Sequence, residues 1–515
     1  MLLTVIQSLA EPLNFLLMIA GTIIGIVFGA IPGLSNVTAQ ALLLPLSFAM
    51  KADTAIIFMS SIFVGGVSGG LISAILMGVP GSPANIATCF DGHPMAKKGR
   101  ASRALGISIF SSFIATLASI AVAMLVCEPV ARVAVKMGPW EFFSLCACAI
   151  VLVVSISKGN MFSGLISAGL GMLLGCVGIA PVDAAKRFTF GITSLLGGMP
   201  LLSVTLGIFA IASLLHNFAR GDMASPDIDT GNIRGIGFTM KEYWAHAKLV
   251  VNSFLIGLGI GFLPGMGAGL SNVVAYAAAK SSSENPEKFG TGCDEGIIAS
   301  EVSNNAAVGG AIIPMIALGI PGDTSTALLI SALMIQGIEA GPNLMRNNTQ
   351  LVYIFFAALL LSGVVTFLLE CFGTRTFPYI LRVPTCYLYS AIFMICMTGA
   401  YANGNSYSYC YITVAMVVIG LLMAFGNLPL SPFILGFILG PMMEEYLRKG
   451  MTYSTNGFLI FLQRPASLCF LAIAVFFLFW PLLRGRRESR KQRQGIKTEL
   501  DMITEQADSY NVSED

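Results

Sequence analysis

Serine and asparagine side chains follow a proline-glycine break inside an apolar segment, and this arrangement occurs twice in the chain. Gly25–Ala39 reads GIVFGAIPGLSNVTA, and Gly257–Ala275 reads GLGIGFLPGMGAGLSNVVA. A helix that begins directly after such a break directs its backbone N–H groups at a carboxylate, and a helix that ends there offers carbonyl oxygens to Na⁺. The two stretches therefore predict sites for an organic anion and for a cation.

A second pair of breaks follows the first pair in the same order. Residues 77–82 read MGVPGS, and residues 318–323 read LGIPGD. The first Pro-Gly motifs are separated by 232 positions (264 − 32), and the second by 241 positions (321 − 80). Two motifs that recur in the same order indicate an internal duplication, and breaks within apolar segments are typical of a transporter binding site.

The side chains at the four breaks add neutral oxygens to these backbone groups. Ser, Asn, Asp and Thr are also preferred at helix N-caps, so capping is the alternative interpretation for each of them. The recurrence of the same chemistry in both halves favours a binding site for the set. The predicted substrate-binding residues are Pro32, Gly33, Ser35, Asn36, Gly81, Ser82, Asn85, Pro264, Gly265, Ser271, Asn272, Pro321, Gly322, Asp323, Thr324 and Ser325.

Glu301, Asn304 and Asn305 are spaced to share one helical face. A carboxylate within an apolar stretch is a functional candidate, and the alternative is an interfacial cap near the charged residues 294–295. With Asn36 and Asn272 these three form the predicted ion-coupling set, for Na⁺ or H⁺, and no metal site beyond a possible Na⁺ is expected. Cofactors are not expected either.

Two other acidic residues allow more than one role. Asp323 follows the last break, where the first half has the neutral Ser82. It has three options: to ligate the coupling cation, to pair with a cationic part of the substrate, or to cap the helix that begins near Thr324. A role in ligand binding or selectivity is favoured. Asp91, close to His93, is expected in a solvated loop, with a proton relay as the alternative.

Composition places the chain among polytopic membrane proteins. Of its 515 residues, 55% are hydrophobic and only 11% are charged, and the mean hydropathy is +0.80. The net charge of +2 argues against a nucleic-acid partner, and the 11 cysteines, without Cys-x-x-Cys spacing, indicate small buried apolar residues. The sequence has no phosphate-binding Gly-x-x-x-x-Gly-Lys motif and no hydrolase motif, so we expect no enzyme and a transporter driven by an ion gradient.

The elements that must position these residues are apolar helices. We expect an all-α protein with roughly 12 transmembrane helices in two homologous halves, arranged as inverted repeats with broken or re-entrant helices. Ala39–Met50 and Leu270–Ala279 are too short to span alone, and Cys89–Arg103 is predicted as a polar, basic loop. The predicted divisions are a first repeat at 1–216, a polar linker at 217–248, a second repeat at 249–484, and a basic then acidic tail at 485–515.

Basic residues predict the orientation. Arginine and lysine residues follow the last apolar segment directly from Arg484, so the C-terminus is expected in the cytoplasm. The first residues carry Glu11 and no basic residue, which favours a periplasmic N-terminus. The first apolar segment lacks a basic leader and is not predicted to be a cleaved signal peptide.

Longer stretches around the breaks resemble the large membrane subunit of tripartite tricarboxylate transporters. In the first half these are residues 29–33 (GAIPG), 41–46 (ALLLPL) and 79–106, which begin VPGSPANIATCFDGHP. In the second half they are residues 261–265 (GFLPG), 290–307 (GTGCDEGIIASEVSNNAA), 313–322 (IPMIALGIPG) and 337–342 (GIEAGP). The chain departs from the usual pattern at Ser35-Asn36, where Gly and Pro are common, and at Asp323, where a small hydroxyl residue is common.

The resemblance implies a multi-pass protein of the bacterial inner membrane. It implies two partners, a small membrane subunit and a periplasmic solute-binding receptor, and substrates that are small organic anions such as citrate and other di- and tricarboxylates. The predicted function is the permease subunit of a receptor-dependent secondary transporter, which imports organic anions with a Na⁺ or H⁺ gradient. An organic-anion channel or a receptor-independent carboxylate exporter is the alternative.

Overall fold

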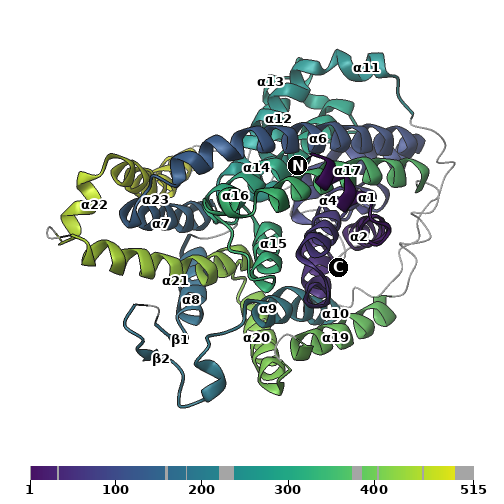
Figure 1. The fold of residues 1–515 in the computed structure, drawn as a ribbon. Helices are drawn as coiled ribbons and strands as arrows, with labels where there is room; N and C mark the ends of the chain where they lie inside the picture. Colours follow the sequence, from purple (N-terminus) through teal and green to yellow (C-terminus); the bar gives the residue numbers. More distant parts are fainter. Residues whose placement is uncertain are drawn as a thin grey trace.

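The computed structural model describes residues 2–31, 34–156, 161–180, 182–219, 237–373, 385–402, 405–454 and 457–492. Pro32 and Gly33, much of the predicted linker and most of the predicted tail lie outside these ranges. The described chain is almost entirely helical, as expected, with one two-stranded hairpin of β1 (Gly178–Ile179) and β2 (Lys186–Arg187). Figure 1 shows the arrangement.

The first half contains ten of the α-helices and several short turns. They are α1 (Leu2–Ala10), α2 (Pro12–Ala30), α3 (Asn36–Leu43), η1 (Leu44–Ala49), α4 (Ala52–Leu76), η2 (Pro83–Asn85), α5 (Ile86–Met95), η3 (Ala96–Arg100), α6 (Ala101–Ala134), α7 (Pro139–Ile156), α8 (Met161–Gly175), η4 (Thr193–Leu195), α9 (Leu201–Thr205), η5 (Leu206–Ile211) and α10 (Ala212–Ala219).

The second half begins with a short helix of the predicted linker. Its elements are α11 (Met240–Ala245), α12 (Ala247–Phe262), α13 (Gly267–Ser282), η6 (Pro286–Lys288), α14 (Asp294–Leu318), α15 (Thr324–Ile335), α16 (Leu344–Asn347), α17 (Thr349–Gly373), α19 (Thr385–Ala402), α20 (Tyr407–Phe425), α21 (Leu430–Thr452), η7 (Gly457–Leu459), α22 (Ile460–Gln463) and α23 (Pro465–Gln492).

Five helices within the described residues are long and apolar enough to cross a membrane, or six if the pair bent by 90° at residue 464 counts as one span. The expected count of about twelve is therefore not confirmed. Other apolar segments form shorter helices, among them α12 and the broken run from α9 to α10. The apolar arms predicted after the first break of each half are present as short helices, α3 with η1 and α13.

Two helices, α4 and α14, form the centre of the protein (Figure 1). Every residue of α4 from Thr54 to Ile75 is buried, and so is every residue of α14 from Gly296 to Ala317. A helix surrounded by protein needs no apolar face toward lipid, so α14 can carry polar side chains along its whole circumference. The apolar core contains side chains from both helices, for example Ile62 and Ile312.

Each central helix packs against the helix that precedes the first break of its half. In the first half, a Cβ at Gly25 would collide with the backbone carbonyl of Ile62, and a Cβ at Gly29 with that of Gly66. Glycine is therefore required for the close approach of α2 to α4, as in membrane helix pairs with Gly-x-x-x-Gly.

The same contacts occur in the second half. A Cβ at Gly257 would collide with the carbonyl of Ser303, and a Cβ at Gly261 with that of Ala307. These glycines lie 232 positions after Gly25 and Gly29, and their partners lie 241 positions after Ile62 and Gly66, which are the separations of the Pro-Gly motifs. The two Gly-x-x-x-Gly stretches therefore make the same close helix contact in both halves of the chain.

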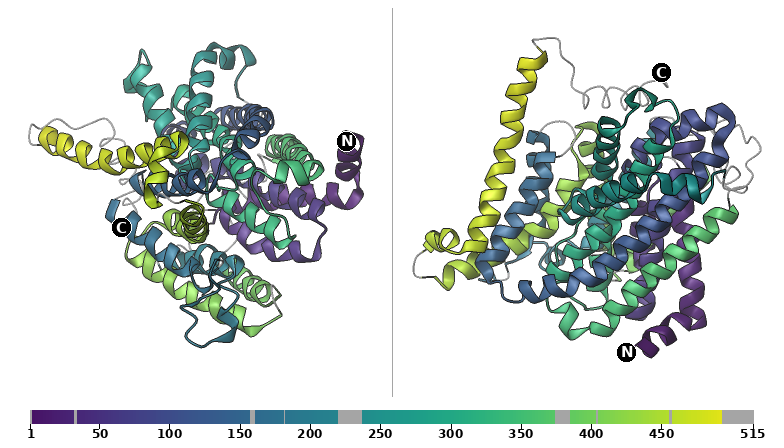
Figure 2. Two further views of the ribbon diagram at one scale, coloured as in Figure 1. Left: turned by 60° about the vertical axis from the view of Figure 1, so that its left-hand side comes forward. Right: turned by 90° about the horizontal axis from the view of Figure 1, so that it is seen from above.

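A separate group of helices lies beside this central part. Helix α8 packs on α21, and α7 lies between α21 and α23 (Figure 2). A Cβ at Gly171 would collide with the backbone carbonyl of Phe433, and the Trp140 indole N–H donates to the carbonyl of Gly450 at 3.0 Å. These helices carry none of the predicted site residues.

The prediction of a polar loop at Cys89–Arg103 is wrong. The segment is helical through α5, η3 and the start of α6, and the chain bends at Gly99, whose φ of +75° favours glycine. Its side chains divide between two environments, because Asp91 is fully buried whereas residues 97–100 are exposed. The density of charged residues was therefore not sufficient to predict a loop.

Candidate functional site

Residues next to all four breaks make contacts in the described structure, and these contacts run between the halves. The Asn36 amide nitrogen, at the start of α3, donates to the Ser325 hydroxyl in α15 at 2.8 Å. Asn272 in α13 donates to the carbonyls of Pro83 and Ala84 in η2. The asparagine of each half therefore contacts the segment after the second break of the other half.

The breaks of the second half also contact each other directly. The Gly265 backbone N–H donates to the carbonyl of Gly322 at 2.6 Å, and a Cβ at Gly267 would lie 2.9 Å from the Cβ of Asp323. Gly265 and Gly267 both have a positive φ, which any other residue would adopt only with strain. Pro264 and Pro321 directly precede this contact.

Several predicted side chains cap helices. Ser35 accepts from the Thr38 N–H at 3.3 Å, Ser82 from the Ala84 N–H at 3.3 Å, and Asp323 from the Thr326 N–H at 2.8 Å. Asp323 accepts both this bond and one from the Thr326 hydroxyl at Oδ1. Capping is thus one role of Asp323.

Other polar atoms near the breaks are buried and have no partner among the described residues. They are Oδ1 of Asn272, Oγ of Ser303 and both amide atoms of Asn304. Ser271 lies beside them and donates to the carbonyl of Ser303 at 3.3 Å. An unpaired buried polar atom costs about 1–3 kcal/mol, so this group is suited to bind a polar ligand or an ion.

Glu301 is fully buried in the middle of α14, so it is not an interfacial cap. Its carboxylate accepts hydrogen bonds from Thr88 at 2.5 Å, Ser112 at 2.9 Å and Asn85 at 3.4 Å. Asn85 in turn accepts from the Ser82 hydroxyl at 2.9 Å. The network therefore joins the second break of the first half to the acidic residue of the second half.

The side chains of Asn305 and Asn304, both on α14, lie in different environments. Asn305 accepts from Thr116 at 3.1 Å and donates to the Ser112 hydroxyl at 2.9 Å, so it supports the Glu301 network. Asn304 makes none of these contacts and belongs to the unpaired group. The three residues predicted to share one helical face, Glu301, Asn304 and Asn305, therefore lie in two different hydrogen-bond environments.

The structure adds Thr88, Ser112 and Asp91 to the predicted residues. Asp91 accepts from the Tyr276 hydroxyl at 2.8 Å and from the backbone N–H groups of Gly290, Gly292 and Cys293. It is 0% exposed, so the expected solvated loop is wrong, and the residue joins α5 to the loop before α14. Thr88 and Ser112 carried no sequence signal, because single hydroxyl residues are common in membrane helices.

A charged cluster marks one end of this part of the protein. Arg103 at the start of α6 pairs with Asp294 at 2.5 Å and with Glu242 of α11 at 2.9 Å. The hydrogen bond from Arg103 holds the pKa of Glu242 below its ordinary value. These pairs fix the linker helix to the first turn of α14.

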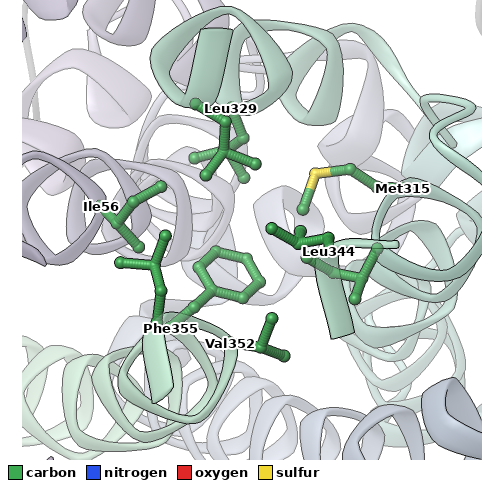
Figure 3. A pocket seen from close by; sticks show the side chains of 9 residues that line it. Ile56, Met315, Leu329, Leu344, Val352 and Phe355 are labelled. Carbon is green, nitrogen blue, oxygen red and sulfur yellow. The ribbon is translucent and has the colours of Figure 1, made fainter. Parts of the chain in front are cut away.

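An apolar cavity between α4, α14, α15 and α17 is not part of the site. Figure 3 shows its lining, which includes Ile56, Met315 and Phe355. All nine lining side chains are apolar, and none of them can donate a hydrogen bond to a carboxylate.

A known family covers most of the chain, including every predicted site residue. The Tripartite tricarboxylate transporter TctA family matches residues 15–435. The chain belongs to this family. As a member of the TctA family it is a multi-pass membrane protein and a transporter subunit, and the sequence resemblance to the large subunit is confirmed.

Two proteins of Agrobacterium vitis are similar to this TctA family member. The first is described as a 52.8 kDa protein in the TAR-I ttuC′ 3′ region, and it is 31% identical over 486 residues, which cover 94% of this chain and 96% of the relative. The second is described as a protein in the TAR-II ttuC′ 3′ region, and it is 30% identical over 233 residues, which cover 45% of this chain and 96% of the relative. No solved structure matches the chain.

Proposed function

We propose that the chain is the permease subunit of a secondary transporter of the bacterial inner membrane, and that it imports small organic anions delivered by a periplasmic receptor. The observation that carries the proposal is the meeting of the breaks within a TctA family member, with the unpaired polar atoms of Asn272, Ser303 and Asn304 beside them. Helix N-termini at α3 and α15 supply N–H groups for an anion.

The two halves would act as inverted repeats that move relative to each other around this site. The reciprocal contacts of Asn36 with α15 and of Asn272 with η2 support a twofold relation. A cation would bind beside the substrate, because neutral amide and hydroxyl oxygens and backbone carbonyls are the ligands that alkali cations prefer. An uncoupled anion channel or a receptor-independent exporter remains the second candidate.

Uptake is expected to require both partners of the family. The chain would be reconstituted in vesicles with the small membrane subunit and the receptor, and the uptake of labelled citrate and of a labelled C4-dicarboxylate would be measured. Omission of either partner should abolish uptake, since no soluble receptor domain occurs within the described part of this chain. Full uptake by the chain alone would contradict receptor dependence. Uptake whose rate does not change with an imposed ion gradient would favour the channel.

Asn36→Ala and Asn272→Ala are each expected to raise the cation concentration needed for half-maximal uptake. Each substitution removes an amide at a break, and Asn272→Ala also removes the unpaired Oδ1. Loss of one ligand oxygen corresponds to roughly 1 kcal/mol or more, hence about fivefold or more in the half-maximal concentration. Asn347→Ala, on an exposed position at the end of α16, is the control. An unchanged cation dependence in both variants would leave the two asparagines as structural links.

A further inference from the structure

Glu370 is a second carboxylate inside the helical core. It lies one turn before the end of α17 and is 1% exposed. Its Oε2 accepts a hydrogen bond from Ser68 of α4 at 2.9 Å, across 302 positions of the sequence, and its Oε1 has no hydrogen-bond partner in the described part of the chain. A buried carboxylate with one unpaired oxygen is energetically costly unless something binds that oxygen.

A small cavity lies beside this carboxylate. Its polar lining consists of Glu370, Ser68, Ser112, Thr116 and Thr366, and its volume is sufficient for about one water molecule. The Phe113 and Phe367 rings, stacked with centroids 4.3 Å apart, form part of its apolar lining. The cavity is therefore polar enough to hold a water at Glu370.

Ser112 connects this cavity with the acidic residue of the candidate site. Its hydroxyl lines the cavity and donates to Glu301 Oε2 at 2.9 Å. Glu370 and Glu301 thus lie on the two sides of one serine on α6.

The charged groups on the elements around Glu370 do not neutralise it. Glu301 is the charged side chain that interacts with it, and its sign is the same. The cation on α6 nearest in sequence, Arg103, is bound to Asp294 and Glu242, while Arg132 pairs with Glu128 at the far end of the helix. Among the other helices that contact α17, α4 carries Asp53 in its first turn, and α16 carries Arg346 at the opposite end of α17. Helices α1 and α2 carry no charged residue. The titratable group next to Glu370 in the sequence is Cys371.

We propose that Glu370 is a proton-binding site, connected through the cavity and Ser112 to Glu301. A proton from water binds Oε1 and forms a neutral carboxylic acid, and its release returns the proton to water and leaves the carboxylate. Na⁺ fits less well, because it needs several oxygens at once, whereas the cavity has room for about one water and five of its ten lining residues have no side-chain oxygen. The proton would supply the coupling of the transport proposed above, and to that extent the inference rests on the proposed function.

The first measurement needs no substrate or receptor. Infrared difference spectra of the purified full chain in lipid nanodiscs, taken from about pH 5 to about pH 9, report carboxyl groups that exchange protons in the range where buried carboxyls of proteins titrate. Glu370→Gln keeps the shape of the side chain and an acceptor for Ser68, so it should fold. We expect the wild-type spectrum to contain a carboxylic-acid band that is absent in Glu370→Gln and present in Glu128→Gln, the control at the exposed end of α6.

The inference is overturned if the wild type and Glu370→Gln give the same difference spectrum, or if the band follows added Na⁺ at fixed pH. In vesicles with both partners, Glu370→Gln should lower uptake driven by an imposed pH gradient to the level without a gradient, while Glu128→Gln should not. If the infrared band is confirmed but no condition gives uptake, the proposed function fails and the proton site stands. If uptake in Glu370→Gln still follows the pH gradient, the coupling role is wrong.

Discussion

Replacement of Glu301 by glutamine is expected to reduce uptake by at least about tenfold without unfolding the protein. The amide has the size of the carboxylate and can still accept from Thr88 or from Ser112, but it carries no charge and cannot accept from both sides. Hydrogen bonds to a charged group contribute about 1.5–3 kcal/mol each, and loss of one corresponds to a tenfold effect or more. The measurement is uptake in vesicles that contain the chain and both partners.

Glu301→Ala should differ from Glu301→Gln in stability. It would leave the donors of Ser112 and Asn85 without an acceptor in a buried environment, at a cost of about 1–3 kcal/mol for each, while Thr88 would keep its bond to the Ser300 hydroxyl. We therefore expect a lower thermal midpoint for Glu301→Ala than for Glu301→Gln in detergent or nanodiscs, because glutamine keeps one acceptor oxygen and alanine keeps none. Wild-type uptake in Glu301→Gln would show that the charge has no part in transport and that the network is structural.

Gly261→Ala is expected to lower the thermal midpoint and the yield of folded protein strongly, whereas Gly259→Ala on the same helix should lower neither. A Cβ at Gly261 would lie 2.5 Å from the backbone carbonyl oxygen of Ala307, and a Cβ at Gly259 has no atom within 4 Å. Backbone cannot yield as a flexible side chain does, so α12 must move away from α14, and such overpacking costs about 1–3 kcal/mol or more.

The pair of variants separates close packing from helix propensity. Both substitutions replace glycine by alanine within α12, so any gain from the better helix former is common to both. Equal midpoints for the two variants would mean that α12 and α14 approach less closely than described. Loss of uptake in Gly261→Ala with an unchanged midpoint would instead indicate that the contact controls movement and not stability.

The prediction of the duplicated breaks and of the polar residues after them depended only on local sequence. Pro-Gly within an apolar segment interrupts a helix wherever it occurs, and Ser82 and Asp323 favour the first position of a new helix in any surroundings. For the same reason α3, α13 and α15 begin close to where the sequence predicted. The spacing of Gly257 and Gly261 likewise depends only on the helical repeat.

Burial of the acidic residues depended on partners far away in the chain. Asp91 is followed by basic residues and looks solvated, yet the loop at residues 290–293 surrounds its carboxylate. Glu370 lies near the end of an apolar segment, where a carboxylate can face the membrane surface as readily as the interior of the protein. The sequence signal that could have identified Glu370 as a functional candidate is the presence of a carboxylate within an apolar segment.

The sequence by itself determined that the chain is a membrane protein, that two Pro-Gly motifs recur in the same order, and where its helices are interrupted, because composition and local backbone preferences act within a few residues. The tertiary structure decided which polar groups meet: Asn36 with Ser325, Glu301 with Ser112, and Glu370 with Ser68. These pairs join helices separated by about 190 to 300 positions, and their formation depends on the packing of whole helices around α4 and α14. No local pattern specifies which face of one buried helix will contact another.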